Sequence, residues 1–278
     1  MNLISPWTAT VQDDIENSRA VWEKKFRDYV FKVYKTSDSL LIVVTWPNNG
    51  RIAFRAAFGM NSSFEITNLL DDAHVLLINL ENRLGKYEVT INFPNLHLPM
   101  FHYKTVFKGN FPMMIPFSPR DIIPLTKGGN IWNTSGDIHM HQSGSRSGIL
   151  FAGMTKPQAG SFFYFQDLGS MSAYCEATET SLAETVGGSW PEIGFQLPLT
   201  EEKPLPADTN FVISDAYIML SDKIIENEVE KTQQFLNNLA EVYKCLPHPD
   251  TVYHDWPEMA RNILNDLYTN KGCWTQTK

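Results

Sequence analysis

The stretch LLIVVTWPNNGRIAFRAAFG, residues 40–59, decides the fold class of this chain of 278 residues. Residues 40–46 form a run of apolar and β-branched side chains that favours a buried strand. The next four residues, Pro47 to Gly50, have the composition of a tight turn, and an apolar pattern resumes over residues 51–59. The stretch therefore predicts a β-hairpin.

Similar segments recur on the C-terminal side of this hairpin. In residues 86–94, Tyr87, Val89, Ile91 and Phe93 alternate with polar residues and fall on one face of an extended chain. Further strands are predicted at 74–81, 148–154, 160–168 and 210–220. Because Gly, Pro and Asn punctuate these segments and no helical pattern separates them, residues 39–220 predict an antiparallel β-sandwich.

The pattern changes to a helical period after residue 220. Ser221 or Asp222 is a candidate N-cap, and LPHP (246–249) ends a predicted helix of roughly 24 residues. Its apolar positions are Ile225, Val229, Leu236, Leu239, Val242, Tyr243 and Leu246. A second helix is predicted within 255–270, with Asp255 as N-cap and Pro257 in its first turn. The chain is therefore expected to be mainly β, with a sandwich domain over 1–220 and a long linker helix and a second helix over 221–278.

Composition excludes some classes of partner. The chain has 23 Lys and Arg against 31 Asp and Glu, a net charge of -8, which disfavours nucleic acid. No apolar run approaches the length of a membrane span, and the N-terminus lacks the pattern of a signal peptide. Three widely spaced cysteines favour a reducing compartment, so a cytoplasmic protein is expected.

Layout and local sequence resemble the glycoside hydrolases and phosphorylases whose catalytic domain is a six-hairpin (α/α)6 barrel. HQSGSRSGILFAG (141–153) and GSFFYFQDLGSMSAYCEATETSLAETVGGSWPEIGFQLP (160–198) look like the final sheet of the β-supersandwich that precedes such a barrel. LPHPDTVYHDWPEMARNILNDLY (246–268) looks like the start of the barrel. The resemblance implies that most of the barrel, with the catalytic carboxyl groups, lies beyond Lys278, so no catalytic residue is carried onto this chain.

Aromatic residues make up 12% of the chain, and aromatic rings pack well on the faces of sugars. The stretch TVGGSWPEIGF, 185–195, offers Trp190 as a stacking ring and Glu192 as a hydrogen-bond acceptor, although the same composition also suits a sheet corner. In residues 160–168, Tyr164 and Gln166 share one face, either exposed to a ligand or packed in the core. Glu176 lies in a carboxylate-rich segment that reads equally well as a solvated loop.

Two further residues are candidate substrate contacts. Arg146, in a Ser- and Gly-rich loop, has a guanidinium suited to a carboxylate or phosphate, with a structural salt bridge as the alternative. His254 precedes the second predicted helix, at its junction with the sandwich. Asp137, His139 and His141 lack a clear further ligand, so no metal site is predicted. No Walker loop, dinucleotide fingerprint or GxSxG motif occurs, and no cofactor is expected.

These observations favour the N-terminal region of a carbohydrate-active enzyme, a region that shapes a cleft for an oligosaccharide or polysaccharide and contacts a C-terminal helical domain. Whether the chain itself is an enzyme is left open. One alternative is a stand-alone carbohydrate-binding module. Another is a structural or assembly protein that uses FPMMIPFSP, residues 111–119, as a contact loop.

Overall fold

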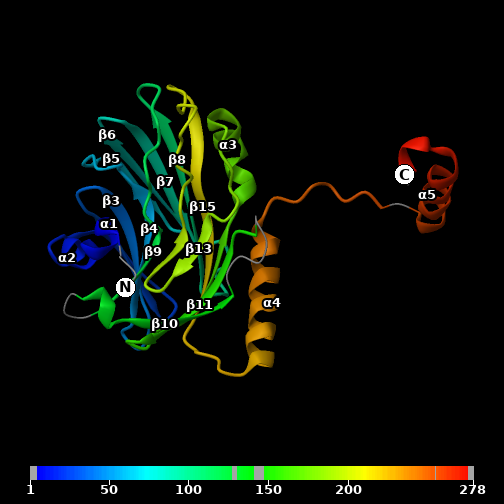
Figure 1. Cartoon of the computed structure of the whole chain (residues 1–278). Helices are drawn as coiled ribbons and strands as arrows, with labels where there is room; N and C mark the ends of the chain where they lie inside the picture. Colours follow the sequence, from blue (N-terminus) through cyan, green and yellow to red (C-terminus); the bar gives the residue numbers. More distant parts are fainter. Residues whose placement is uncertain (1–4, 127–129, 141–146, 254, 275–278) are drawn as a thin grey trace. The chain divides into compact units, whose positions relative to one another are not determined.

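A computed structural model describes residues 5–126, 130–140, 147–253 and 255–274, and most of them lie in two antiparallel sheets (Figure 1). The smaller sheet has the strand order β1-β2-β3-β4-β9-β14-β13, and the larger has β10-β11-β12-β15-β8-β7-β6-β5. Strands of the smaller sheet are β1 (Ala20–Phe26), β2 (Tyr29–Lys35), β3 (Ser39–Thr45), β4 (Arg51–Phe58), β9 (Ile122–Leu125), β13 (Val186–Ser189) and β14 (Glu192–Phe195). Those of the larger are β5 (Glu65–Asp72), β6 (Val75–Asn82), β7 (Gly85–Asn92), β8 (Met100–Gly109), β10 (Ser135–Met140), β11 (Ile149–Lys156), β12 (Gly160–Gln166) and β15 (Asn210–Ser221). The prediction of a mainly β, antiparallel sandwich is confirmed.

Aromatic rings from both sheets fill the space between them. The ring of Phe54, on β4, lies edge-on to Phe101 on β8 and Phe162 on β12, with centroids 5.3 and 6.0 Å apart. Phe31 of β2 also meets Phe101, at 5.2 Å. Edge-to-face geometry is the favourable arrangement for such pairs, so the two sheets share one well-packed aromatic core.

The hairpin predicted at residues 40–59 is formed by β3 and β4, which pair from Ser39 opposite Phe58 to Thr45 opposite Arg51. Six of the seven β3 residues are buried because both faces of this strand are covered. Leu40, Ile42 and Val44 face the core between the sheets, whereas Leu41 and Val43 pack under a short helix on the outer face. The double burial explains why the strand reads as a continuous apolar run.

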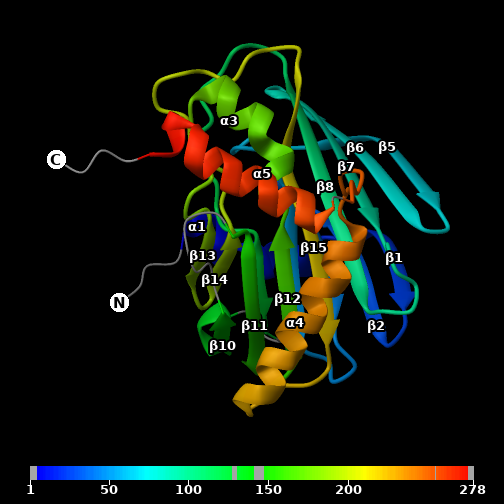
Figure 2. The same cartoon turned by 90° about the vertical axis from the view of Figure 1, so that its right-hand side faces the viewer.

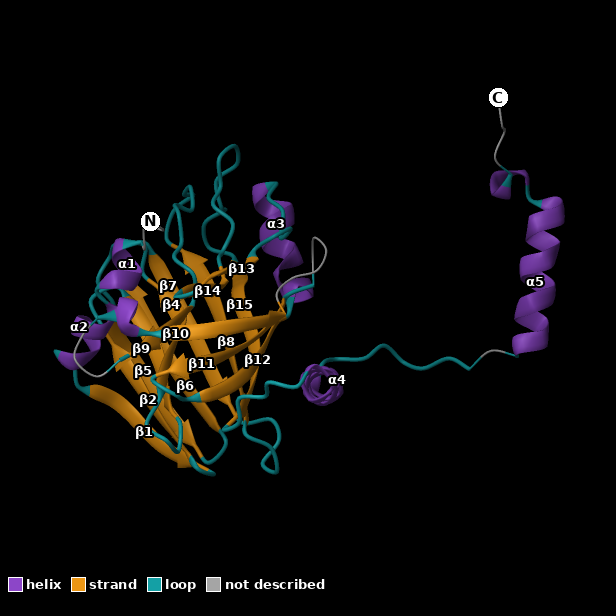
Figure 3. Cartoon of the chain, turned by 60° about the horizontal axis from the view of Figure 1, so that its bottom comes forward, coloured by secondary structure: helices purple, strands orange, loops and turns teal. Residues whose placement is uncertain are grey.

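Short helices cover parts of the two sheets. Helices α1 (Pro6–Ala9) and α2 (Val11–Glu16) lie beside the smaller sheet, where Val11 and Ile15 pack on its outer face (Figure 3). Helix α3 (Ser172–Thr178) follows β12 and buries Tyr174 in the core. Single 3₁₀ turns occupy Ile131–Asn133, Leu168–Met171 and Lys271–Cys273.

Helix α4 (Glu228–Cys245) runs along the outer face of the larger sheet in Figures 1 and 2. Its Phe235 ring meets Phe163 of β12 and Phe151 of β11, with centroids 5.6 and 6.5 Å apart. The helix begins later than predicted, and its first amides bond to the Asn227 side chain instead of Ser221 or Asp222. Residues 221–223 continue the sheet contacts of β15, because the carbonyls of Ser221 and Lys223 accept bonds from the Trp46 side chain and from Ser161.

The chain divides into two compact units, Met1–Lys244 and Cys245–Lys278, so almost all of α4 belongs with the sandwich. In the second unit, α5 (Trp256–Thr269) is capped as predicted, since the Asp255 carboxylate accepts a bond from the Glu258 amide at 3.1 Å. No residue of α5 is buried. Within the described ranges, no helix combines the length and the apolar character needed to cross a bilayer.

Candidate functional site

A polar hollow of the sandwich flanks the hairpin β13–β14. Residues 178–185 lead into this hairpin and residues 196–202 leave it, and together they border a space of about 510 Å³. Carboxylates and hydroxyls dominate its lining: Thr178, Glu179, Thr180, Ser181, Glu184, Thr185, Glu201 and Glu202. A second space of about 420 Å³ adjoins it across Thr180 and Ser181 and reaches Glu176 on α3. We call these two spaces the rim groove.

Buried anchors fix the backbone of the rim groove. Thr178 is buried and donates to the carbonyl of Tyr174, at 2.7 Å, which holds the end of α3. Thr185 is also buried and donates to the carbonyl of Leu182 at 2.9 Å. Between these anchors, Glu179 and Glu184 adopt positive φ angles of 55° and 60°, and both side chains are exposed. The carboxylates are thus carried on a constrained loop.

The rim groove is strongly acidic. Lys203 forms an ion pair with Glu179 at 3.1 Å, but both side chains are largely exposed, so the pair contributes little stability. Glu176, Glu184, Glu201 and Glu202 add four further carboxylates to the lining. Such a surface repels phosphate and sulfate groups and accepts hydrogen bonds from neutral or cationic ligands.

Trp190 and Glu192 belong to the same hairpin but do not line the rim groove, and both are engaged within the fold. The Trp190 ring packs against Gly136 of β10, and its indole N–H donates to the Thr134 hydroxyl at 3.0 Å. The Glu192 carboxylate accepts bonds from the amide and hydroxyl of Ser5 and from the Thr8 hydroxyl. Trp190 therefore joins the two sheets, and Glu192 fastens α1 to β14.

Tyr164 and Gln166 are fully buried in the core, so the face they share is not the exposed one considered above. The Tyr164 hydroxyl lies 2.6 Å from the Gln166 carbonyl oxygen and 2.7 Å from Oδ2 of Asp121. The Tyr103 hydroxyl donates to the same Oδ2 at 2.6 Å, and the Phe195 amide donates to Oδ1 at 2.7 Å. Burial raises the pKa of Asp121 to about 6, against the opposing effect of these hydrogen bonds.

The Tyr164 hydroxyl can pair with either protonation state of Asp121, because it has two partners for one proton. A phenol has one proton to donate, and the amide oxygen of Gln166 can only accept it. When Tyr164 donates to Gln166, its short contact with Asp121 is satisfied only if the carboxyl group supplies the proton. Tyr164 therefore contacts a buried carboxyl group, Gln166 contacts Tyr164, and neither side chain reaches the surface.

Glu176 is exposed on α3 and lines the rim groove, where it remains a predicted ligand contact. Arg146 and His254 lie outside the described residues. His141 does as well, and the described residues hold no group of three or more His, Cys, Asp or Glu side chains arranged to bind a metal ion.

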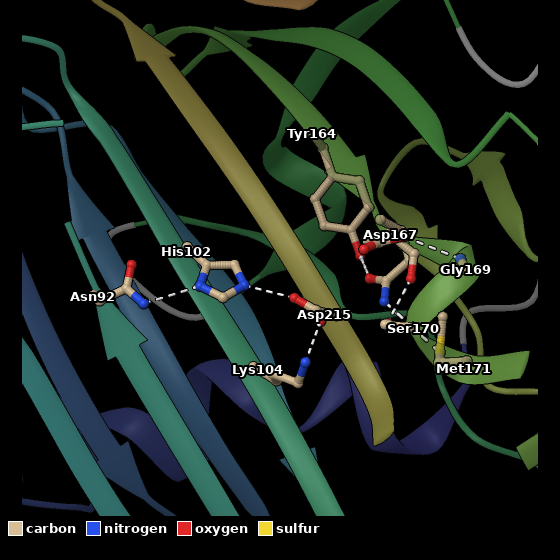
Figure 4. Close-up of polar contacts among 10 residues, drawn as sticks. Asn92, His102, Lys104, Tyr164, Asp167, Gly169, Ser170, Met171 and Asp215 are labelled. Atoms are coloured by element: carbon tan, nitrogen blue, oxygen red, sulfur yellow. Dashed lines mark hydrogen bonds and ion pairs between the residues drawn. The ribbon is translucent and has the colours of Figure 1, made fainter. Parts of the chain in front are cut away.

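A histidine–carboxylate pair on the larger sheet was not predicted from the sequence. His102 of β8 lies 2.6 Å from Asp215 of β15, and Lys104 pairs with the same carboxylate at 2.8 Å (Figure 4). The other ring nitrogen of His102 lies 3.1 Å from the Asn92 amide. Burial would raise the pKa of Asp215, but its bonds to His102 and Lys104 outweigh burial and lower it.

Both ring nitrogens of His102 are thus occupied within the sheet, so the imidazole has no nitrogen left to act as a general base in this arrangement. The pair stabilises the junction of β8 and β15. Strand periodicity places His102 and Lys104 on one face of β8, but the pairing with a strand more than 100 residues away carries no local signal.

Comparisons of the chain with known protein families, with curated proteins and with solved structures found no match.

Proposed function

We propose that this chain forms the β-sandwich region of a carbohydrate-active enzyme and that the rim groove contacts an oligosaccharide. The order of two large antiparallel sheets, a helix along the larger sheet and a further helix supports the resemblance to six-hairpin glycoside hydrolases and phosphorylases. In this function the chain shapes a sugar cleft and contributes binding contacts, while the bond-breaking carboxyl groups belong to a helical domain.

The rim groove is the observation that carries the proposal. Sugar hydroxyls both donate and accept hydrogen bonds, and the groove offers carboxylate acceptors beside hydroxyls that can do either. The larger space, about 510 Å³, lies within the range of small-molecule sites. Because the lining is acidic, the expected ligand is a neutral or amino sugar rather than a phosphorylated, sulfated or uronic one.

Recognition in the groove is polar. The described residues that line it include no aromatic ring, and Trp190 packs against Gly136 instead. Without a stacking platform, a sugar held only by hydrogen bonds at an open surface gains little net free energy, because each bond replaces one to water. We expect the isolated chain to bind neutral oligosaccharides with dissociation constants in the millimolar range.

NMR titration of the purified chain with neutral oligosaccharides tests this function. Amide shifts should concentrate at residues 178–185 and 196–202, and Glu184→Gln combined with Glu201→Gln should weaken binding at least fivefold without changing the melting temperature. Glu65→Gln, the same change at an exposed position on β5, serves as the control. Absence of saturable shifts in the groove across neutral and amino sugars would refute the proposal.

The stand-alone carbohydrate-binding module remains the alternative with the same groove. The length of the open reading frame distinguishes the two functions. A reading frame that continues into several helical hairpins favours the enzyme, whereas one that stops favours the module.

A different observation favours assembly as a second candidate. Phe111, Met114 and Phe117 are 45%, 43% and 43% exposed on one short segment, and neighbouring exposed apolar side chains often mark a protein interface. Self-association that Phe111→Ser and Met114→Ser abolish, together with no sugar binding, would support that role. Light scattering of the wild type and the double variant measures it.

A further inference from the structure

A cavity distinct from the rim groove lies between the two sheets. It is bordered by the end of β4, by residues 115–121, by Phe195 and Leu197, and by Ile213 and Ser214 of β15. Its volume is about 40 Å³, which is room for roughly three or four water-sized groups. The exposed Pro116 borders it on the solvent side.

Four polar side chains line the cavity: Arg55, Asp121 and Ser214, which are 4%, 5% and 7% exposed, and the half-buried Ser118. Asp121 is already satisfied by Tyr103, Tyr164 and the Phe195 amide. Arg55 uses three of its five N–H groups, donating to Ser39 Oγ and to the carbonyls of Arg120 and Trp7.

Ser214 is the unsatisfied member of this set. Its hydroxyl is buried and has no partner at hydrogen-bonding distance and angle. The Tyr103 hydroxyl is close enough to interact with it, but the two groups do not have the geometry of a hydrogen bond. A buried hydroxyl without a partner costs about 1–3 kcal/mol, so an oxygen atom next to Ser214 is favoured.

Apart from Ser118, the remaining wall is apolar. Ala57, Met60, Ile115 and Leu197 surround the space away from Ser214. A buried water molecule needs two to four polar partners, and water molecules next to these apolar side chains would have too few hydrogen-bond partners. The cavity therefore suits a molecule with one polar end at Ser214 and an aliphatic body against these side chains.

We propose that this cavity binds a small neutral organic molecule with about three or four non-hydrogen atoms, one of which is a hydroxyl or carbonyl oxygen that bonds to Ser214. The ligand is neutral because, at pH 7 where Asp121 is ionised, the opposite charges of Arg55 and Asp121 leave no net charge for an ion to balance. The proposal is independent of the sugar-binding function, since the two spaces share only Leu197 among their linings.

The test uses 1-propanol as the probe and follows the methyl NMR signals of Met60 and Ile115 in the whole chain. Binding should shift both signals saturably, with a dissociation constant in the millimolar range expected of so small a ligand. Ser214→Ala should weaken 1-propanol about two- to tenfold, which is the contribution of one neutral hydrogen bond, and should leave xenon binding unchanged or stronger. Ser181→Ala, in the rim groove, is the matched control and should change neither the binding of 1-propanol nor that of xenon.

Filling the cavity provides the second arm. Ala57→Val should abolish saturable binding of both probes, and Leu197→Phe serves the same purpose if the first variant does not fold. The proposal is overturned if shifts at Met60 and Ile115 grow linearly and match those at the exposed Val229, or if Ser214→Ala binds 1-propanol as the wild type does. A crystal soaked in 1-propanol that shows only water in the cavity would overturn it equally.

Discussion

Ionisation of Asp121 should make the protein less stable as the pH rises from 4 to 7. The carboxyl group is 5% exposed, and its pKa rises from 3.8 to about 6 on folding, with desolvation as the main cause. Between these two values the folded state binds one proton more than the unfolded state, so the free energy of unfolding falls with increasing pH. At ~1.36 kcal/mol for each tenfold difference in proton affinity, the total loss is about 3 kcal/mol.

Replacement of Asp121 by Asn isolates this contribution from that of other groups. The amide introduced by Asp121→Asn would still donate to Tyr164, as a protonated carboxyl group does, but would lose the bond from the Tyr103 hydroxyl. At pH 4 we therefore expect the wild type to be more stable than Asp121→Asn by about 1 kcal/mol. Between pH 4 and pH 7 this difference in the free energy of unfolding should move by roughly 2 kcal/mol in favour of the variant, because part of the total loss already occurs below pH 4.

Urea unfolding followed by tryptophan fluorescence, at half-unit steps from pH 4 to 8, measures both proteins. Asp250→Asn makes the same chemical change at an exposed position, so its free energy of unfolding should depend on pH as that of the wild type does. The free energy of unfolding of the wild type minus that of Asp121→Asn should fall as the pH rises. If this difference stays constant within about 0.5 kcal/mol, or rises with pH, the reasoning is refuted. Carbon NMR of the Asp121 carboxyl group supplies an independent check, because its titration midpoint should lie near 6.

Two further substitutions test the structural roles assigned to β13–β14. Glu192→Ala should remove three hydrogen bonds between β14 and the start of α1, and so lower the free energy of unfolding by about 1–3 kcal/mol. Residues 5–16 should become accessible to limited proteolysis, while the rim groove should be unaltered. An unchanged digestion pattern would contradict this role of Glu192. Gly136→Ala should lower the free energy of unfolding by about 1–3 kcal/mol, because the new Cβ would lie 2.4 Å from the Trp190 ring. Most of that loss should disappear when Trp190 is also replaced by Ala. If the losses of the two substitutions are additive, the ring is not the obstacle.

Sequence periodicity was sufficient to predict several strands that have one apolar and one polar face, or two apolar faces. It identified β3, β4, β6, β7, β11, β12 and β15 close to their observed ends. It gave no separate prediction for β1, β2, β5, β8, β9, β10, β13 and β14. In β1, for example, an edge strand, only Trp22 is buried, so the alternation of apolar and polar residues is weak. The helix after residue 220 was placed too early because the apolar period gives no sign that 221–223 still belong to the sheet.

The candidate site was harder to predict, for a physical reason. Trp190 and Glu192 have the composition of a binding loop, but Glu192 meets Ser5, which lies 187 residues away in the chain. Tyr164 and Gln166 alternate as an exposed pair would, yet Tyr164 bonds to Asp121, which comes from a distant loop. Contacts between remote segments decide whether a polar side chain serves a ligand or the fold, and a local pattern contains no information about them.

The order of the strands also has a consequence for synthesis of the chain. Strand β4 pairs with β9, which follows it by about 60 residues, so on the ribosome its second edge stays open for roughly 3–12 s at typical elongation rates. An open apolar edge invites pairing with other nascent chains. Arg51 and Arg55 place two positive charges on this strand, and before Arg55 is buried they would repel an identical neighbour. The buried arginine of the finished sandwich would then have served, earlier, to keep nascent copies of the same chain apart.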